Sequence, residues 1–150
     1  MAVRPILLHP DERLRAVCAP VGAVTDEVRA LAADLLETMY DAPGRGLAAP
    51  QVGVLSRAFV MDVAWKDADP DPVVMIDPEV LDASGATEGI EESCLSLPGE
   101  PRVVVRPLEV AMAWTDLDGE RVHRRLAAMA ARCAQHELDH LDGVLILDRV

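Results

Sequence analysis

The sequence predicts an α+β fold in which antiparallel β-sheets surround a central helix, with a further helix near the N-terminus. Three observations support this prediction. Apolar residues recur at helical spacing after Thr25, apolar and polar residues alternate over positions 108–115, and an alanine-rich stretch without Gly or Pro covers positions 127–141. Helices that pack on antiparallel strands are typical of α+β domains.

The first helix is predicted to begin after Thr25. The hydroxyl group of Thr25 suits an N-cap, and Asp26 and Glu27 follow where the helix dipole favours negative charge. The pattern ends before Pro43 and Gly44, which do not continue a helix. One face of this helix is expected to lie on the core, because apolar residues recur at 3.6-residue spacing: Val28, Leu31, Leu35, Leu36 and Met39.

Short β-type runs follow this helix, at positions 57–62, 73–76, 102–105 and 108–115. The last run has a single apolar face, formed by Leu108, Val110, Met112 and Trp114. Asp118 and Gly119 then predict a hairpin turn into a further strand at 120–124. These runs indicate an antiparallel sheet.

A second helix is predicted over positions 127–141, ending at Asp142 and Gly143. The Pro- and Asp-rich loop at 66–72 comes with no change of composition that would mark a domain boundary. Since 150 residues are the usual size of one domain, we expect a single domain over residues 1–150.

The composition is that of a globular protein, with 51% hydrophobic and 27% charged residues. A net charge of -12 disfavours direct binding to nucleic acid. We expect neither a signal peptide nor a membrane span, because the N-terminal apolar run is short and 18 apolar residues never occur together. Three cysteines are too few for a disulfide framework, so a reducing cytoplasm is the expected location.

The second predicted helix contains His136, Glu137 and His140 in a His-Glu-x-x-His arrangement. A spacing of four residues places both imidazoles on one helix face, about 6 Å apart along the axis, which suits two ligands of one divalent metal ion. Glu137 lies beside them as a proton acceptor for water. The alternative is that both histidines are solvated helix residues. A catalytic ion needs a third ligand, and the sequence beyond His140 is too short to supply one readily, so we expect it upstream.

Two cysteines are candidates for the third ligand. Cys133 shares the helix face with His136 but lies about 10 Å along the axis from His140, which favours a packing role. Cys94 follows polar residues and precedes Pro98 and Gly99, which indicates the edge of a strand or loop. Taken alone, Cys94 is more typical of an inert buried thiol, but two histidines elsewhere make it the better candidate.

A stretch of small residues runs from Gly44 to Gly53 and contains Gln51, whose side-chain amide is a hydrogen-bond donor. Taken alone it is an ordinary turn, and it lacks the lysine of a phosphate-binding loop.

These three segments, in this order, resemble the peptide deformylase family. The family has Gly-x-Gly-x-Ala-Ala-x-Gln, Glu-Gly-Cys-Leu-Ser and Gln-His-Glu-x-x-Asp-His, which correspond here to Gly44–Gln51, Glu92–Ser96 and Gln135–His140. The resemblance implies a metal-dependent hydrolase that removes the formyl group from the N-terminal formyl-methionine of nascent polypeptides and releases formate.

The resemblance also assigns roles to single residues. Cys94, His136 and His140 would bind the metal, Glu137 would be the general acid and base, and Gln51 with the backbone N–H of Leu95 would stabilise the oxyanion. The ion would be Fe²⁺, with Zn²⁺ or Ni²⁺ as substitutes, since a Cys-His-His set accepts all three.

Further implications concern the substrate and its surroundings. Gly44, Arg45, Gly46, Glu92 and Cys133 would line a methionine pocket, and Arg102 or Arg106 would steady Glu92 or the peptide. Asp139 is a candidate partner for a ligand imidazole. The expected partners are N-formylmethionyl nascent peptides and, in transient contact, the ribosome; no membrane is expected.

The sequence departs from the family pattern in three places. Arg45 replaces a residue that is often hydrophobic, Ser93 replaces the glycine before the metal cysteine, and the sequence stops at Val150 without the extension of many members. Two other functions stay open at this point. A zinc endopeptidase would share the helix motif, and a non-catalytic metal-binding protein would share the ligands but would not need Glu137.

Overall fold

The computed structural model describes residues 2–149, and Met1 and Val150 lie outside the described residues. The helices are α1 (Asp26–Asp41) and α2 (Ala128–Leu141), with short 3₁₀ helices at Glu12–Arg15, Ala49–Val52 and Ile146–Arg149. The strands are β1 (Gly46–Ala48), β2 (Ala58–Met61), β3 (Val73–Ala83), β4 (Thr87–Cys94), β5 (Leu97–Pro107), β6 (Glu109–Thr115) and β7 (Arg121–Ala127).

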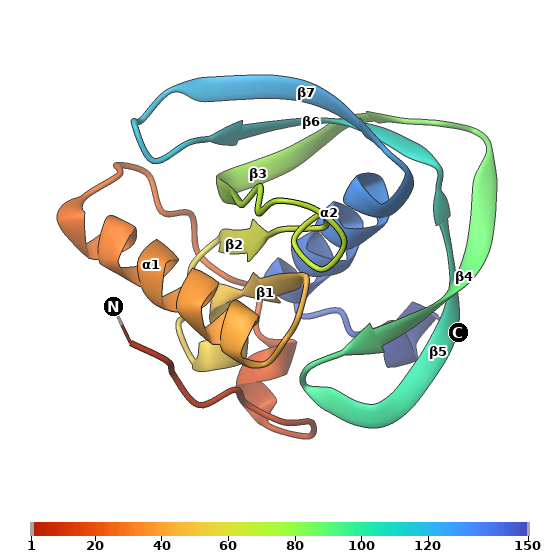
Figure 1. Cartoon of the computed structure of the whole chain (residues 1–150), viewed down its shortest axis with the longest axis horizontal. Helices are drawn as coiled ribbons and strands as arrows, with labels where there is room; N and C mark the ends of the chain where they lie inside the picture. Colours follow the sequence, from red (N-terminus) through yellow and green to blue (C-terminus); the bar gives the residue numbers. More distant parts are fainter. Residues whose placement is uncertain (1, 150) are drawn as a thin grey trace.

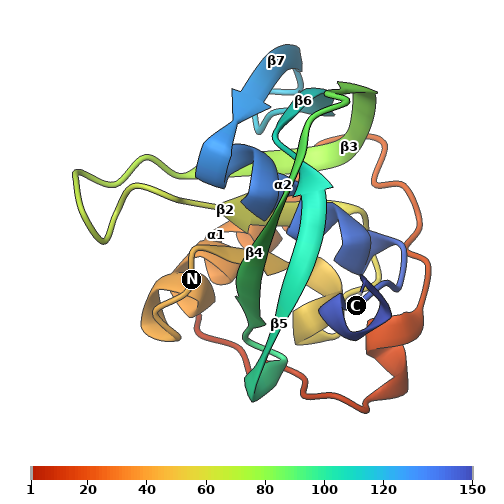
Figure 2. The ribbon, with the colours of Figure 1, turned by 90° about the vertical axis from the view of Figure 1, so that its right-hand side faces the viewer.

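The strands form two antiparallel sheets around α2. One sheet has five strands in the order β1-β2-β3-β6-β7, and the other consists of β4 and β5. Figure 1 shows α2 at the centre, with α1 on one side and the β4–β5 pair on the other. Seen from the side, β4 and β5 lie across the front of α2 (Figure 2). The predicted α+β fold with a central helix is confirmed.

The first predicted helix is confirmed as α1. Thr25 is its N-cap, and its side-chain oxygen accepts a hydrogen bond from the backbone N–H of Val28 at 3.3 Å. Leu31, Leu35 and Met39 are buried in the cluster that joins α1 to β1 and β2. The helix ends at Asp41, before Pro43, as expected from the sequence.

The structure extends the predicted strands and adds two. β3 and β5 each have 11 residues, because they continue past the short apolar runs into exposed positions. β1 and β4 were not predicted, since β1 has three residues and β4 is exposed along most of its length. The hairpin at Asp118 and Gly119 is confirmed, and Gly119 has the positive φ of 81° that this turn requires.

The second predicted helix is confirmed as α2, which follows β7 without a loop. β7 ends at Ala127 and α2 begins at Ala128, whose φ of 51° turns the chain at the junction. Ala131 and Ala134 are fully buried against the five-stranded sheet, so small side chains let α2 lie deep in the molecule. None of the helices within residues 2–149 has the length and apolar character needed to cross a bilayer.

Candidate active site

Three side chains from distant parts of the sequence meet beside α2. Cys94 is the last residue of β4, while His136 and His140 are one turn apart on α2. One possible ligand atom of each residue lies within 4.8 Å of the other two, and Cys94 Sγ is 3.4 Å from Nε2 of His140. The structure therefore brings together the residues that the sequence predicts as metal ligands.

This donor set fits a divalent transition metal ion. Nδ1 of His136 lies 2.9 Å from a carboxylate oxygen of Glu92, which leaves its Nε2 for an ion. One thiolate and two imidazoles suit Fe²⁺, Zn²⁺ and Ni²⁺. Three protein ligands leave a further position for water or substrate, as in catalytic rather than structural sites.

The surroundings shift the pKa values of the two imidazoles in opposite directions. Burial, together with His136 and Arg106, lowers the pKa of His140 well below its usual range, so this ring is neutral near pH 7. Burial also tends to lower the pKa of His136, but Glu137, Cys94 and Glu92 outweigh it and raise this pKa to about 10. A bound metal ion would carry positive charge in place of the proton on His136. Metal binding is therefore expected to release this proton.

Glu92 lies behind His136 and is the centre of a buried charge network. Its carboxylate accepts hydrogen bonds from Arg106 at 2.6 and 2.9 Å and from Arg132 at 2.5 Å, besides its contact with His136. Burial tends to raise the pKa of Glu92, but His136 and Arg106 lower it to about 2. The ionised carboxylate orients the His136 imidazole, whereas substrate binding by Glu92 stays a prediction.

Arg106 connects Glu92 to Asp139. Nη1 of Arg106 lies 2.9 Å from Asp139, and Arg149 contacts the same carboxylate at 2.7 Å. Asp139 thus supports His136 through Arg106 and Glu92. Of the two arginines that the sequence offers as a support for Glu92, Arg106 is in contact, whereas Arg102 donates to the carbonyl group of Pro101 at 2.9 Å.

Arg132 was not predicted from the sequence as a residue of this site. It lies one turn before His136 on α2 and, besides Glu92, donates to the carbonyl groups of Val104 at 2.9 Å and Glu88 at 2.7 Å. An arginine four residues before a ligand histidine, in an otherwise apolar helical stretch, was the available signal. Arg132 thereby ties α2 to both strands of the β4–β5 sheet.

Glu137 is buried beside the predicted metal ligands and faces the backbone of β1. Its Oε1 has no hydrogen-bond partner, and a Cβ atom at Gly46 would come within 2.5 Å of its Oε2. Glycine at position 46 is therefore what allows the carboxylate to approach the strand. Burial is the main cause that raises the pKa of Glu137, to about 7. A carboxyl group with this pKa is suited to accept and return a proton near neutral pH.

Gln51 is held with its amide nitrogen toward Cys94. Its Oε1 accepts a hydrogen bond from the backbone N–H of Ala48 at 3.0 Å, so Nε2 is the atom that points to the site. Nε2 lies 3.0 Å from the hydroxyl oxygen of Ser96 and 3.8 Å from Cys94 Sγ. Leu95 follows Cys94 directly and lines the same pocket, which places both predicted oxyanion residues at one wall.

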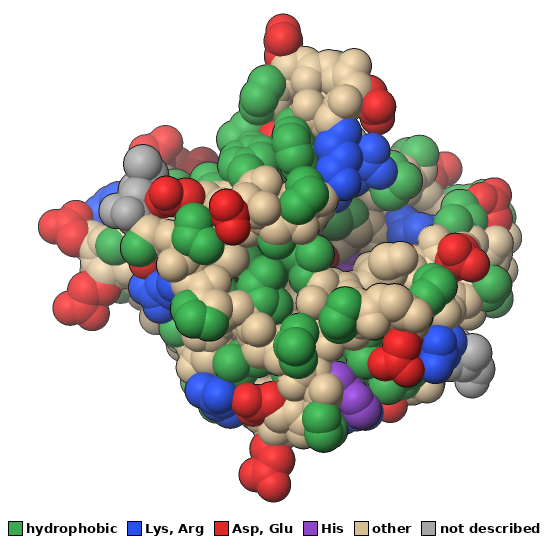
Figure 3. Space-filling model, turned by 60° about the horizontal axis from the view of Figure 1, so that its bottom comes forward, with side chains coloured by type: hydrophobic (Ala, Val, Ile, Leu, Met, Phe, Trp, Pro, Cys, Tyr) green, Lys and Arg blue, Asp and Glu red, His purple; other side chains and the backbone are tan. Residues whose placement is uncertain are grey.

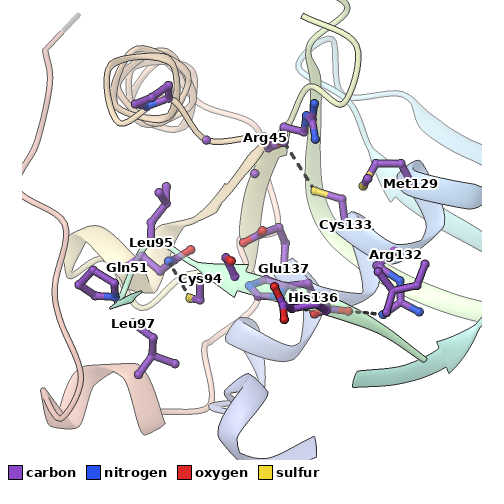
Figure 4. Close-up of a pocket in the computed structure, with 18 of the residues that line it drawn as sticks. Arg45, Gln51, Cys94, Leu95, Leu97, Met129, Arg132, Cys133, His136 and Glu137 are labelled. Atoms are coloured by element: carbon purple, nitrogen blue, oxygen red, sulfur yellow. Dashed lines mark hydrogen bonds and ion pairs between the residues drawn. The ribbon is translucent and has the colours of Figure 1, made fainter. Parts of the chain in front are cut away.

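A pocket of about 410 Å³ opens in front of these groups. Figure 3 shows a hollow on this face, with basic side chains at its edge and part of a histidine inside. Cys133 lies in the wall with its Sγ 3.5 Å from the carbonyl oxygen of Arg45, outside the ligand set (Figure 4). The pocket lining contains the residues predicted for substrate binding: Gly44, Arg45, Gly46, Glu92 and Cys133.

Replacing Arg106 by methionine is expected to lower the free energy of unfolding by roughly 3 kcal/mol, because a buried carboxylate loses one of its partners while Arg132 remains. Urea unfolding at fixed metal loading measures this loss. Arg125→Met is the control, since the ion pairs of Arg125 are exposed, and its unfolding midpoint should stay close to that of the unmodified protein. Equal losses in both variants would contradict a special role for the buried network.

The sequence matches the family described as Polypeptide deformylase over residues 3–150. A peptide deformylase of Methylocella silvestris is 47% identical over 153 residues, covering 100% of this chain and 78% of the relative. A peptide deformylase of Afipia carboxidovorans is 49% identical over 148 residues, covering 99% of this chain and 86% of the relative.

Solved structures agree with the sequence matches. The crystal structure of peptide deformylase from Thermotoga maritima has a TM-score of 0.94 at 39% identity and covers 100% of this chain and 99% of its own. A Met-Ala-Ser-bound structure of a class I type b peptide deformylase from Acinetobacter baumannii has a TM-score of 0.92 at 34% identity, with 99% of both chains covered. Sequence and fold agree over nearly the whole chain, and the chain therefore belongs to the peptide deformylase family.

Proposed function

We propose that Cys94, His136 and His140 bind one divalent metal ion and that Glu137, Gln51 and Leu95 carry out the deformylation around it. Members of this family are metal-dependent hydrolases that remove the formyl group from the N-terminus of nascent peptides. The observation that supports this assignment most strongly is the meeting of three donor atoms within 4.8 Å of one another, next to a buried carboxyl group.

The residues around the ligands have separate tasks. A divalent ion held by Cys94, His136 and His140 would lower the pKa of a water molecule and would also polarise the formyl carbonyl group. Glu137 accepts a proton from the attacking water and returns it to the leaving amine. The Gln51 amide and the Leu95 backbone N–H donate to the oxygen on which negative charge develops, and these preset donors cost little reorganisation. Glu92 and Arg106 hold His136 in place.

We further propose Fe²⁺ as the ion, with Zn²⁺ and Ni²⁺ as substitutes, because thiolate and imidazole ligands accept all three. A reducing cytoplasm suits this site, since the three cysteines are free and one of them must act as a thiolate ligand. Transient contact with the ribosome follows from a substrate that is a nascent peptide.

The proposed substrate is a peptide with N-terminal formyl-methionine. The pocket beside the ligands contains apolar groups from Leu95, Met129 and Cys133, which suit the methionine side chain. The Met-Ala-Ser-bound relative from Acinetobacter baumannii supports this choice, because Met-Ala-Ser is the product expected from formyl-Met-Ala-Ser.

Formate release from formyl-Met-Ala-Ser by iron-loaded protein, prepared without oxygen, tests the proposal. We expect stoichiometric formate and Met-Ala-Ser, and no cleavage of unblocked peptides. Protein that contains one metal ion per chain but releases no formate would overturn the proposed function. Cleavage of internal peptide bonds would instead indicate an endopeptidase.

Replacing Ser93 by glycine is expected to raise kcat/KM for formyl-Met-Ala-Ser several-fold. Ser93 lines the pocket at the point where the β4–β5 register shifts, between Glu92 and Cys94. Its side chain therefore occupies space at the wall along which the substrate backbone is expected to pass. Steady-state kinetics measure the change, with metal content as the control for an intact site. An unchanged or lower kcat/KM at equal metal content would show that Ser93 does not obstruct the substrate.

A further inference from the structure

Arg45 is a cation in the pocket wall whose charge is weakly neutralised. Its only ion pair among the described residues joins Nη2 to Asp67 at 3.3 Å, and the Asp67 side chain is 80% exposed, so water screens this contact. Its Nε is buried and has no hydrogen-bond partner in this part of the chain. A guanidinium group has five donors; the buried Nε is out of the reach of a ligand, whereas the Nη1 donors have no ion-pair partner among the described residues and remain available.

The backbone of Arg45 is fixed, which determines where the side chain lies. Its carbonyl oxygen accepts a hydrogen bond from the backbone N–H of Asp62 at 2.8 Å and lies 3.5 Å from the Sγ of Cys133. Figure 4 shows Arg45 near Cys133 and Met129, at the end of the pocket away from Gln51 and Leu97. The side chain of Arg45 therefore lies at the opposite end of the pocket from Gln51 and Leu97, within reach of a peptide that extends past its first residue.

The outer part of the pocket is open and contains a second cation. Met129 and Ile90, which line it, are 48% and 41% exposed. Lys66 also belongs to the lining and lies 5.7 Å from the ring centre of Trp65. Trp65 in turn donates to the carbonyl group of Gly44 at 2.9 Å, so the loop that carries Lys66 is attached to the pocket rim.

The other charges of the lining offset these two cations only in part. Arg132 and Glu92 neutralise each other in the buried network. Glu91 also lines the pocket and is exposed, so water screens its charge. A chain with a net charge of -12 thus keeps two cations at the rim of its pocket.

We propose that Arg45, assisted by Lys66, makes this protein select formylated peptides that carry an acidic side chain at the second or third residue. This inference rests on the proposed function and adds a substrate preference to it. A guanidinium group binds a carboxylate through two parallel hydrogen bonds, which an aliphatic residue at position 45 cannot offer. A charge-assisted hydrogen bond of this kind corresponds to roughly a tenfold preference in kcat/KM for a glutamate over a glutamine side chain.

The test uses C-terminally amidated peptides that differ by one group. Formyl-Met-Glu-Ser is compared with formyl-Met-Gln-Ser, and formyl-Met-Ala-Glu with formyl-Met-Ala-Gln, so that the two pairs distinguish the second from the third residue. The unmodified protein is expected to show a glutamate-to-glutamine ratio in kcat/KM of roughly ten for at least one pair, and this ratio should fall with added salt.

Variants at position 45 assign the preference to its source. Arg45→Met should bring the ratio close to one, and Arg45→Lys should keep part of it. Arg125→Met removes an arginine of the β7 surface and should leave the ratio unchanged. A ratio near one in the unmodified protein, or a ratio that survives in Arg45→Met, would overturn the inference.

Calorimetric binding of the deformylated peptides Met-Glu-Ser and Met-Ala-Glu, against their glutamine counterparts, gives a readout that does not need turnover. A glutamate preference in Kd that disappears in Arg45→Met supports the role of Arg45 even if no formate is released. Formate release from all peptides at equal rates, with equal Kd values, would reject this inference and leave the proposed function standing.

Discussion

Replacing Glu137 by alanine is expected to lower the kcat of formate release by roughly 10²–10⁴-fold while the protein keeps its metal ion. Glu137 is not in the group of three donor atoms, yet its carboxyl group is buried between α2 and Gly46 at the same pocket. Of the two buried carboxyl groups in the pocket lining, only Glu137 is not held in an ion pair, because the charge of Glu92 is taken up by Arg106 and Arg132. The Glu137→Ala variant therefore lacks the group that carries the proton.

The measurement combines steady-state kinetics with metal analysis of the same preparation. Glu120→Ala, in the exposed segment before β7, is the matched control and should leave both values unchanged. Full turnover in Glu137→Ala, at one metal ion per chain, would show that another group moves the proton.

Replacing Cys94 by alanine is expected to weaken metal binding by on the order of 10²-fold or more, since even the loss of an outer partner of a ligand costs 10–100-fold. Cys94 is the only one of the three proposed ligands that comes from the β4–β5 sheet. Its loss leaves two imidazoles on one helix. Turnover should fall with metal content, and metal competition with a chelator measures the affinity.

Cys133→Ala is the control for this variant, because Cys133 lies on the same helix as the histidines but outside the ligand set. It should keep its metal ion. Loss of metal from Cys133→Ala together with full retention in Cys94→Ala would show that the wrong thiol has been assigned.

The local parts of this structure could be predicted from the sequence, because their signals lie within a few residues. The cap at Thr25, the apolar face of α1 and the four-residue spacing of His136 and His140 all depend on helix geometry. Cys94 lies 46 residues before His140, and taken alone it is more typical of an inert buried thiol. Only the two histidines of the helix motif make it the better candidate for the third ligand.

The missed parts depend on contacts between segments far apart in the chain. β4 has no alternation of apolar and polar residues, since it pairs only with β5 and is largely exposed. The network of Glu92 joins residues up to 44 positions apart, so neither the contacts of Arg132 nor the position of Glu92 behind His136 could be predicted from the sequence. Local patterns carry no information on such pairings.

The direct junction of β7 and α2 determines the rotational setting of the two histidines. Since Ala127 ends the strand and Ala128 begins the helix, no loop can absorb a change in length between them. One inserted residue would turn the helix by about 100° and shift it by about 1.5 Å relative to the sheet. Both imidazoles would then face away from Cys94. The five-stranded sheet thus acts as the reference frame that sets the angle of the ligand helix, and this part of the chain tolerates substitutions better than insertions or deletions.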